Sequence, residues 1–174
     1  VLLKNLVARK RSDYLRRDDN TVIDPIEMLG LANRELLELH VNKYATMVVG
    51  CLDREANILE YSVAGHLPKP VLMTPDHIEY LPGEGMPVGL TPEATFGLEK
   101  TRLPETFMLV LMSDGVLETI DEVDLIERER MLLSRLGGTL EKPGHLIRRL
   151  DLGEVTSDDL ADDIAGLFVS RGVG

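Results

Sequence analysis

Carboxylates adjoin apolar runs at two places in the chain. Asp114 and Gly115 directly follow the apolar run 106–113. The second place is an acidic cluster just before the apolar run 164–171, and it contains Asp158, Asp159, Asp162 and Asp163. If the two runs are neighbouring strands of one sheet, these aspartates meet at one edge of it. Hard divalent cations such as Mg²⁺ and Mn²⁺ prefer oxygen ligands of this kind.

Glycine next to the first carboxylate suits a cation site, because a residue without Cβ lets a ligand approach closely. Asp-Gly pairs are also common in turns, and runs of Asp are common where helices start. The spacing alone therefore leaves a metal site and ordinary turns both open.

A histidine stands at a comparable position. Gly65 and His66 end the extended run 58–65 and precede the proline-rich loop in "VAGHLPKPVL". Such a histidine can be a general acid, a metal ligand or a loop residue that hydrogen-bonds within a turn. The residues around His66 leave these three readings open.

Composition and missing motifs exclude several classes. Lys plus Arg number 19 and Asp plus Glu number 30, a formal net charge of −11 that disfavours nucleic-acid binding. There is no apolar run of about 18 residues, so no membrane span is expected. Walker A, G-x-G-x-x-G, nucleophile-elbow and paired-cysteine motifs are missing, which argues against the corresponding nucleotide, serine-hydrolase and zinc proteins. A single cysteine and no recognisable export signal predict a cytoplasmic protein.

Hydrophobic periodicity predicts the elements that position these residues. Helices are expected at 1–17, from Asp24-Pro25 to 39, at 122–136 (ended by Gly137-Gly138) and at 143–150. A β-hairpin is expected from strands 44–53 and 58–65. Further strands are expected at 69–75, 77–82, 95–103, 106–113 and 164–171. Hairpins with helices before and after them predict one α+β domain, with a largely antiparallel sheet covered by helices.

The order of five motifs carries a resemblance. They are "YATMVVGCLD", "LEYSVAGHLPKPVL", "GMPVGL", "LVLMSDGVLE" and "ADDIAGLFVSR", between Tyr44 and Arg171. In order and spacing they are similar to the bacterial metal-dependent phosphatases of the protein phosphatase 2C superfamily, in the branch of stage II sporulation protein E. The set also resembles the phosphatase domain of RssB-type response regulators. The resemblance implies a four-layer αββα sandwich, two mainly antiparallel sheets flanked by helices.

The resemblance also implies an activity and a site. A binuclear Mn²⁺ or Mg²⁺ centre would activate a water that attacks a phosphoserine or phosphothreonine of a protein. Asp114 matches the family's Asp-Gly metal ligand, Asp162 matches the first acid of its closing Asp-Asp motif, and Asp163 is adjacent. Gly115 and His66 would lie near the site, and no catalytic group beyond the metal-bound water is implied.

One departure limits these expectations. The family's upstream hairpin, with its Gly-Asp and Asp-x-Ser-Gly-His-Gly motifs, is not in this sequence. We therefore expect 1–174 to be one phosphatase-like domain that is incomplete at its N-terminus, with weak or absent metal binding and no measurable turnover by itself.

The implied partners are a phosphoprotein, such as an anti-anti-sigma factor or another sigma-factor regulator, and an upstream receiver domain. A homodimer is also compatible with the resemblance. The alternatives are an inactive adaptor with the same fold that binds a sigma factor or its regulator, and a metal hydrolase acting on small molecules.

Overall fold

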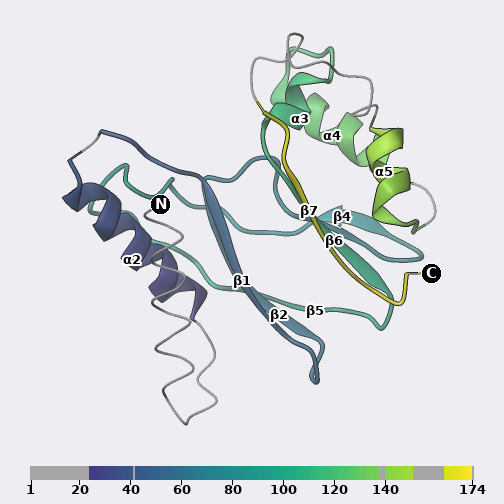
Figure 1. Cartoon of the computed structure of the whole chain (residues 1–174), viewed down its shortest axis with the longest axis horizontal. Coiled ribbons are helices and arrows are strands. Elements are labelled where there is room, and N and C mark those ends of the chain that lie inside the picture. The colour runs from purple at the N-terminus through teal and green to yellow at the C-terminus, as the bar shows by residue number, and fades with distance from the viewer. Residues whose placement is uncertain (1–23, 41, 138–139, 151–162, 174) are drawn as a thin grey trace. The chain divides into compact units, whose positions relative to one another are not determined.

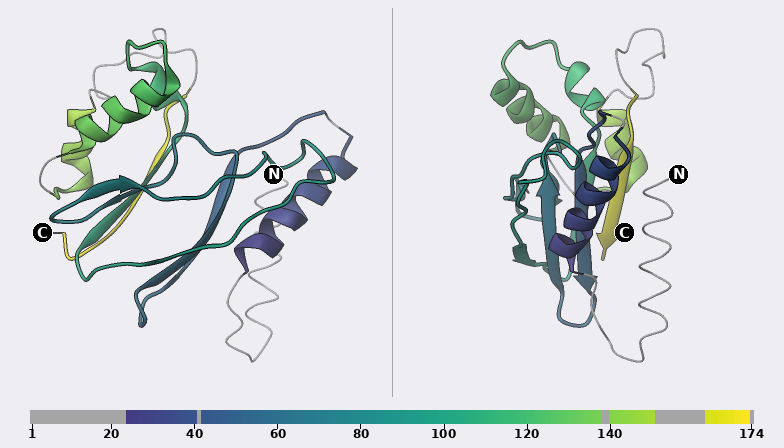
Figure 2. Two further views of the ribbon diagram at one scale, coloured as in Figure 1. Left: turned by 180° about the vertical axis from the view of Figure 1, so that it is seen from behind. Right: turned by 90° about the vertical axis from the view of Figure 1, so that its left-hand side faces the viewer.

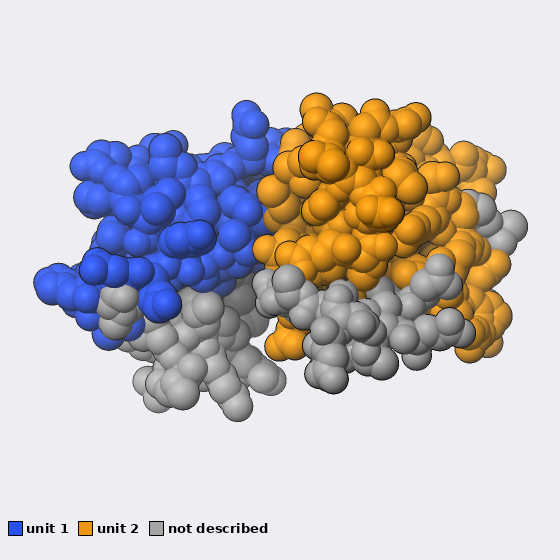
Figure 3. Space-filling model, turned by 90° about the horizontal axis from the view of Figure 1, so that it is seen from above, with its two compact units in different colours: residues 1–66, 83–102 blue, residues 67–82, 103–174 orange. Residues whose placement is uncertain are grey.

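Two antiparallel sheets, each with helices of its own, make up the described part of the protein (Figure 1). The structure is a computed structural model that describes residues 24–40, 42–137, 140–150 and 163–173. The sheets belong to two compact units (Figure 3): unit 1, residues 1–66 and 83–102, and unit 2, residues 67–82 and 103–174. The predicted α+β class, with two antiparallel sheets flanked by helices, is confirmed. The helix predicted at 1–17 lies outside the described residues, and the single-domain assignment stays a prediction.

Unit 1 contains a three-stranded sheet and one described helix. Its elements are α2 (Pro25–Glu38), β1 (Met47–Asp53), β2 (Ile58–Ala64) and β5 (Glu99–Arg102), with strand order β1-β2-β5. The predicted hairpin is present, since β1 pairs antiparallel with β2 from Met47↔Ala64 to Asp53↔Ile58. Its turn is held by Asp53, whose carboxylate accepts hydrogen bonds from the backbone N–H groups of Ala56 and Glu55, both 2.9 Å long. These bonds lower the pKa of Asp53, because they stabilise its charged form.

Helix α2 starts where the sequence predicted. The Asp24 carboxylate accepts hydrogen bonds from the N–H groups of Ile26 (2.8 Å) and Glu27 (3.3 Å), and Pro25 occupies the first turn. The helix packs along β1 and β2 (Figure 2). The buried residues of this core are Leu29 and Ala32 of α2, Ala64 of β2, and Val88.

A buried asparagine joins α2 to the loop that precedes β5. Asn33 is 4% exposed. Its amide nitrogen donates to the Thr91 carbonyl (3.0 Å), and its amide oxygen accepts from the Gly89 N–H (2.6 Å). Gly89 has φ of +84°, a conformation that glycine adopts at little cost. The close approach of this loop to α2 therefore depends on both residues.

Unit 2 contains a four-stranded sheet and three described helices. The strands are β3 (Val71–Met73), β4 (Ile78–Tyr80), β6 (Phe107–Met112) and β7 (Gly166–Arg171), in the order β4-β3-β6-β7. The helices are α3 (Gly115–Glu118), α4 (Leu125–Leu136) and α5 (Pro143–Arg149). Strands β6 and β7 pair antiparallel from Phe107↔Arg171 to Met112↔Gly166. The apolar runs 106–113 and 164–171 are thus neighbours in one sheet, the condition that the sequence argument set for the aspartates.

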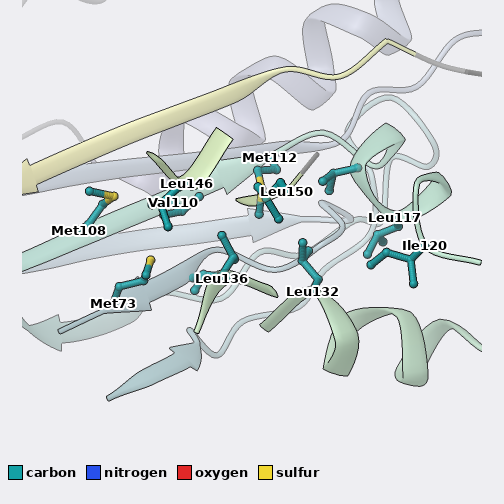
Figure 4. Packing of buried hydrophobic residues seen from close by; sticks show 12 residues of the cluster. Met73, Met108, Val110, Met112, Leu117, Ile120, Leu132, Leu136, Leu146 and Leu150 are labelled. Atoms are coloured by element: carbon teal, nitrogen blue, oxygen red, sulfur yellow. The ribbon is translucent and has the colours of Figure 1, made fainter. Parts of the chain in front are cut away.

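The core of unit 2 lies between this sheet and its helices (Figure 4). The sheet contributes Val71, Met73, Met108, Val110 and Met112, and the helices with their adjoining residues contribute Val116, Leu117, Ile120, Leu132, Leu136, Leu146 and Leu150. Tyr80 of β4 adds a polar link, since its hydroxyl donates to the Glu129 carbonyl of α4 (2.8 Å). The helices of unit 2 are therefore packed on its sheet, and α4 is also hydrogen-bonded to β4.

Helix α4 begins three residues later than the pattern predicted. Asp124 caps it by accepting hydrogen bonds from Ile126 N–H (2.9 Å) and Glu127 N–H (3.2 Å), which leaves Glu122 and Val123 outside the helix. Its C-terminal carbonyls are bound by Arg149 of α5, which donates to the carbonyls of Leu136 (2.9 Å) and Gly137. Among the described residues, no helix combines the length and apolar character that crossing a bilayer requires.

Candidate functional site

One serine joins the two strands where the predicted carboxylates lie. Ser113 directly follows β6, and its backbone N–H donates to the Ala165 carbonyl (2.9 Å), which extends the β6–β7 pairing by one residue. Its hydroxyl donates to the Asp163 carbonyl (3.0 Å) and accepts from the Ala165 N–H (2.8 Å). Three hydrogen bonds from one residue therefore fix the end of β6 against the start of β7.

Asp114 follows this serine and stands at the N-cap position of the short helix α3. Its side chain is exposed and makes no capping hydrogen bond to that helix. Gly115, by contrast, is buried as the first residue of α3. Val116 and Leu117 anchor α3 in the unit 2 core (Figure 4). The carboxylate of Asp114 is thus presented at the surface from a backbone held on both sides.

Asp163 precedes β7 and lies at the same end of the β6–β7 pair as Asp114. It is exposed and is tied to Ser113 through its carbonyl oxygen. The structure therefore brings two of the predicted residues, Asp114 and Asp163, to one sheet edge. Asp162, the third predicted ligand, lies outside the described residues.

His66 lies in the other unit. It is half-buried, follows β2 and is the last residue of the first segment of unit 1. Gly65 before it has φ of +65°. The proposed role of His66 near the site stays a prediction.

The donor chemistry at this edge fits a divalent cation as part of a ligand set. Asp114 and Asp163 carry carboxylate oxygens, which Mg²⁺ and Mn²⁺ prefer, and neither metal needs a soft ligand. Within residues 24–40, 42–137, 140–150 and 163–173, no group of three or more His, Cys, Asp or Glu residues is arranged to hold a metal. The described residues thus supply two candidate ligands, fewer than a complete protein site for two metals needs.

Comparison with known families decides the affiliation. The family described as stage II sporulation protein E (SpoIIE) matches residues 5–172, nearly the whole chain. The chain belongs to the SpoIIE family. The resemblance of the five motifs to the stage II sporulation protein E branch is thereby confirmed, and the likeness to RssB-type response regulators stays a prediction. Among curated protein sequences, no match was found.

Solved structures support the SpoIIE assignment at the level of the fold. The phosphatase domain of SpoIIE from Bacillus subtilis with a fragment of its regulatory domain matches with TM-score 0.70 and 17% identity, over 98% of this chain and 48% of that one. The RsbU and RsbW domains of Rv1364c from Mycobacterium tuberculosis match with TM-score 0.67 and 23% identity, over 99% and 48%. RsbX in complex with magnesium matches with TM-score 0.67 and 15% identity, over 97% and 70%. The fold is therefore that of the protein phosphatase 2C phosphatase domain, and the chain spans between about half and 70% of the length of these structures.

Two features of the site were not predicted from the sequence. The bridging role of Ser113 was not predicted, although the sequence places this serine between an apolar strand and the Asp-Gly pair. Helix α3 was also missed, because Val116 and Leu117 continue the apolar character of β6 across the Asp-Gly pair. Four residues are too few to show a helical period, so no local signal distinguished a helix from a continued strand.

Proposed function

We propose that this SpoIIE-family domain is a metal-dependent serine/threonine protein phosphatase that acts on a phosphoprotein of a sigma-factor regulatory system. The observation that carries the proposal is the Ser113 bridge, which sets Asp114 and Asp163 at one sheet edge. Two carboxylates there, with Asp162 adjacent in sequence, suit Mn²⁺ or Mg²⁺. A bound divalent cation would activate water and neutralise phosphoryl oxygens.

The roles of the chain's own residues follow from their positions. Asp114 and Asp163, with Asp162, would hold the metal. Ser113 and the buried part of α3 would fix the backbone that carries Asp114, so that this backbone does not reorganise when a ligand binds. Because the described residues supply two candidate ligands, a binuclear centre would need further ligands from outside them.

The proposed substrate and setting come from the names of the matched proteins. One matched structure contains RsbU and RsbW domains, and another is described in connection with the bacterial stressosome. The resemblance of the five motifs adds the rest of the proposal: the substrate is an anti-anti-sigma factor or a related regulator, and the protein works in the cytoplasm, with an upstream receiver domain as its input. These two structures are at most 23% identical to this chain, so the substrate and the cellular setting are proposed here and not transferred.

The test is phosphate release by the full-length natural protein from a phosphoserine peptide, with and without Mn²⁺. Asp114→Asn should lower the Mn²⁺-dependent rate by about 100-fold or more, because it removes a ligand charge. Asp76→Asn is the matched control, as Asp76 is also exposed in unit 2. Equal rates in the wild type and Asp114→Asn would refute the proposal.

A second candidate function is an inactive adaptor with the same fold. Calorimetry with Mn²⁺ separates the two, since an adaptor that has lost its metal site should show no binding in the full-length protein.

A further inference from the structure

An exposed apolar cluster lies at the start of α4. Val123 exposes 96% of its surface, Ile126 72% and Leu125 44%. In the described part of the chain, no other four consecutive residues contain three exposed large hydrophobic side chains. Gathered apolar surface of this kind marks interaction sites, whereas single exposed hydrophobic residues are ordinary.

The packing of unit 2 does not account for these side chains. The buried residues of α4 are Leu132 and Leu136, in the second half of the helix. Neither Val123 nor Ile126 belongs to the unit 2 core. Their apolar surface is therefore available to something outside the described fold.

The backbone beneath the cluster is well fixed. Val123 N–H donates to the Glu122 carboxylate (2.9 Å), and the Arg128 side chain donates to the Glu122 carbonyl. The Asp124 cap then fixes the first turn of α4. A surface that is ordered before binding loses less conformational entropy when a partner arrives.

The charges around the cluster restrict the partner. The segment 118–127, "ETIDEVDLIE", has no Lys, Arg or His, and its acidic residues are Glu118, Asp121, Glu122, Asp124 and Glu127. Glu127 forms an ion pair with Arg130 of the same helix, so the negative charge offered to a partner comes mainly from the other four. Such a surface repels nucleic acid and anionic lipid. A symmetric contact with a second copy would set carboxylates against carboxylates. The complementary partner has Lys or Arg beside apolar side chains.

We propose that residues 118–127 form a docking surface for a basic, amphipathic segment of a partner protein. Apolar side chains of that segment contact Val123 and Ile126, and its Lys or Arg side chains pair with the surrounding carboxylates. The docking surface requires no metal and no turnover, so it goes beyond the proposed phosphatase activity and holds equally for an adaptor.

Two synthetic peptides test it by fluorescence anisotropy: an amphipathic helix of Leu and Lys, and its counterpart of Leu and Glu. The wild type should bind the Leu/Lys peptide and not the Leu/Glu peptide. Val123→Ser combined with Ile126→Ser should weaken that binding about tenfold. The control, Met86→Ser with Leu90→Ser, removes two apolar side chains of unit 1 that are 52% and 53% exposed and should leave the affinity within about twofold.

A second pair of variants tests the contribution of the carboxylates to binding. Glu118→Gln with Asp121→Asn should weaken binding, whereas Asp76→Asn with Glu84→Gln, which remove two exposed carboxylates elsewhere, should not. All variants alter exposed residues, and equal urea midpoints would verify that they fold alike. Absence of Leu/Lys binding, or equal losses in the control variants, would overturn the proposal. So would a wild-type dimer in sedimentation velocity that Val123→Ser with Ile126→Ser dissociates, because the occupant would then be a second copy.

Discussion

Ser113 and Asp163, fifty residues apart in the chain, are joined by a hydrogen bond of 3.0 Å from the Ser113 hydroxyl to the Asp163 carbonyl. The same hydroxyl accepts from the Ala165 N–H at 2.8 Å. One small side chain therefore bridges the end of β6 and the start of β7. The candidate ligands Asp114 and Asp163 lie on either side of this bridge, so their spacing depends on it.

Replacing Ser113 by Ala should separate the two strand ends. The change removes both hydroxyl bonds and should lower the free energy of unfolding by about 1 kcal/mol, because the exposed groups regain water. It should also weaken Mn²⁺ binding by the full-length protein about tenfold, as a residue that orients ligands does. Urea unfolding and calorimetry measure the two effects.

Thr119→Val is the matched control for that change. Thr119 also uses its hydroxyl, which donates to the Val116 carbonyl (2.7 Å), but it makes no bond to β7. It should lower stability without changing Mn²⁺ affinity, and Ser113→Thr should retain much of the wild-type affinity. Wild-type Mn²⁺ affinity in Ser113→Ala would show that the bridge does not position the ligands.

Two glycines should respond to alanine in opposite ways. A Cβ at Gly89 would lie 2.8 Å from the Lys43 carbonyl oxygen and 3.0 Å from the Leu36 Cβ, and φ there is +84°. Gly89→Ala should therefore destabilise the protein by about 2 kcal/mol or more. Gly144, in the first turn of α5, has nothing within 4 Å of its Cβ position, so Gly144→Ala should stabilise by about 0.5 kcal/mol. The same urea titration measures both, and a stabilising Gly89→Ala would contradict the close packing of this loop.

Local sequence signals predicted the helices and strands, whereas the pairing of distant strands and the position of the aspartates depend on tertiary contacts. Asp24-Pro25 marked the start of α2, and alternation marked the β1–β2 hairpin, because caps and strand periods are short-range features. The pairing of β6 with β7 could be stated only as a condition, since residues 113–165 separate the two strands in the chain. Asp114 and Asp163 were therefore placed at one edge by the fold and not by their spacing.

Polar side chains that bind distant backbone left no signal in the sequence. Asn33 lies among the apolar residues of α2, and hydrophobic periodicity alone predicts that a polar residue such as this one is exposed. Its two bonds to the loop at Gly89 and Thr91 exist only once the helix packs on the sheet. Ser113 is the corresponding case at the candidate site.

Tyr80 should make stability fall at alkaline pH. Its half-buried ring raises the pKa of the phenol well above the ordinary value of 10.0, first through desolvation and second through the nearby Glu129 charge. Because the folded state keeps the proton that the unfolded state releases, this contribution is complete below about pH 10 and is lost as the pH rises further. In Tyr80→Phe, which also loses the bond to the Glu129 carbonyl, the free energy of unfolding should be lower by about 1 kcal/mol at neutral pH. The decline of this free energy of unfolding between about pH 9 and about pH 11 should be smaller in Tyr80→Phe than in the wild type.

Tyr44→Phe is the control, since Tyr44 is largely exposed and its replacement should leave the alkaline decline unchanged. Identical declines in Tyr80→Phe and the wild type would show that the Tyr80 proton is not linked to folding.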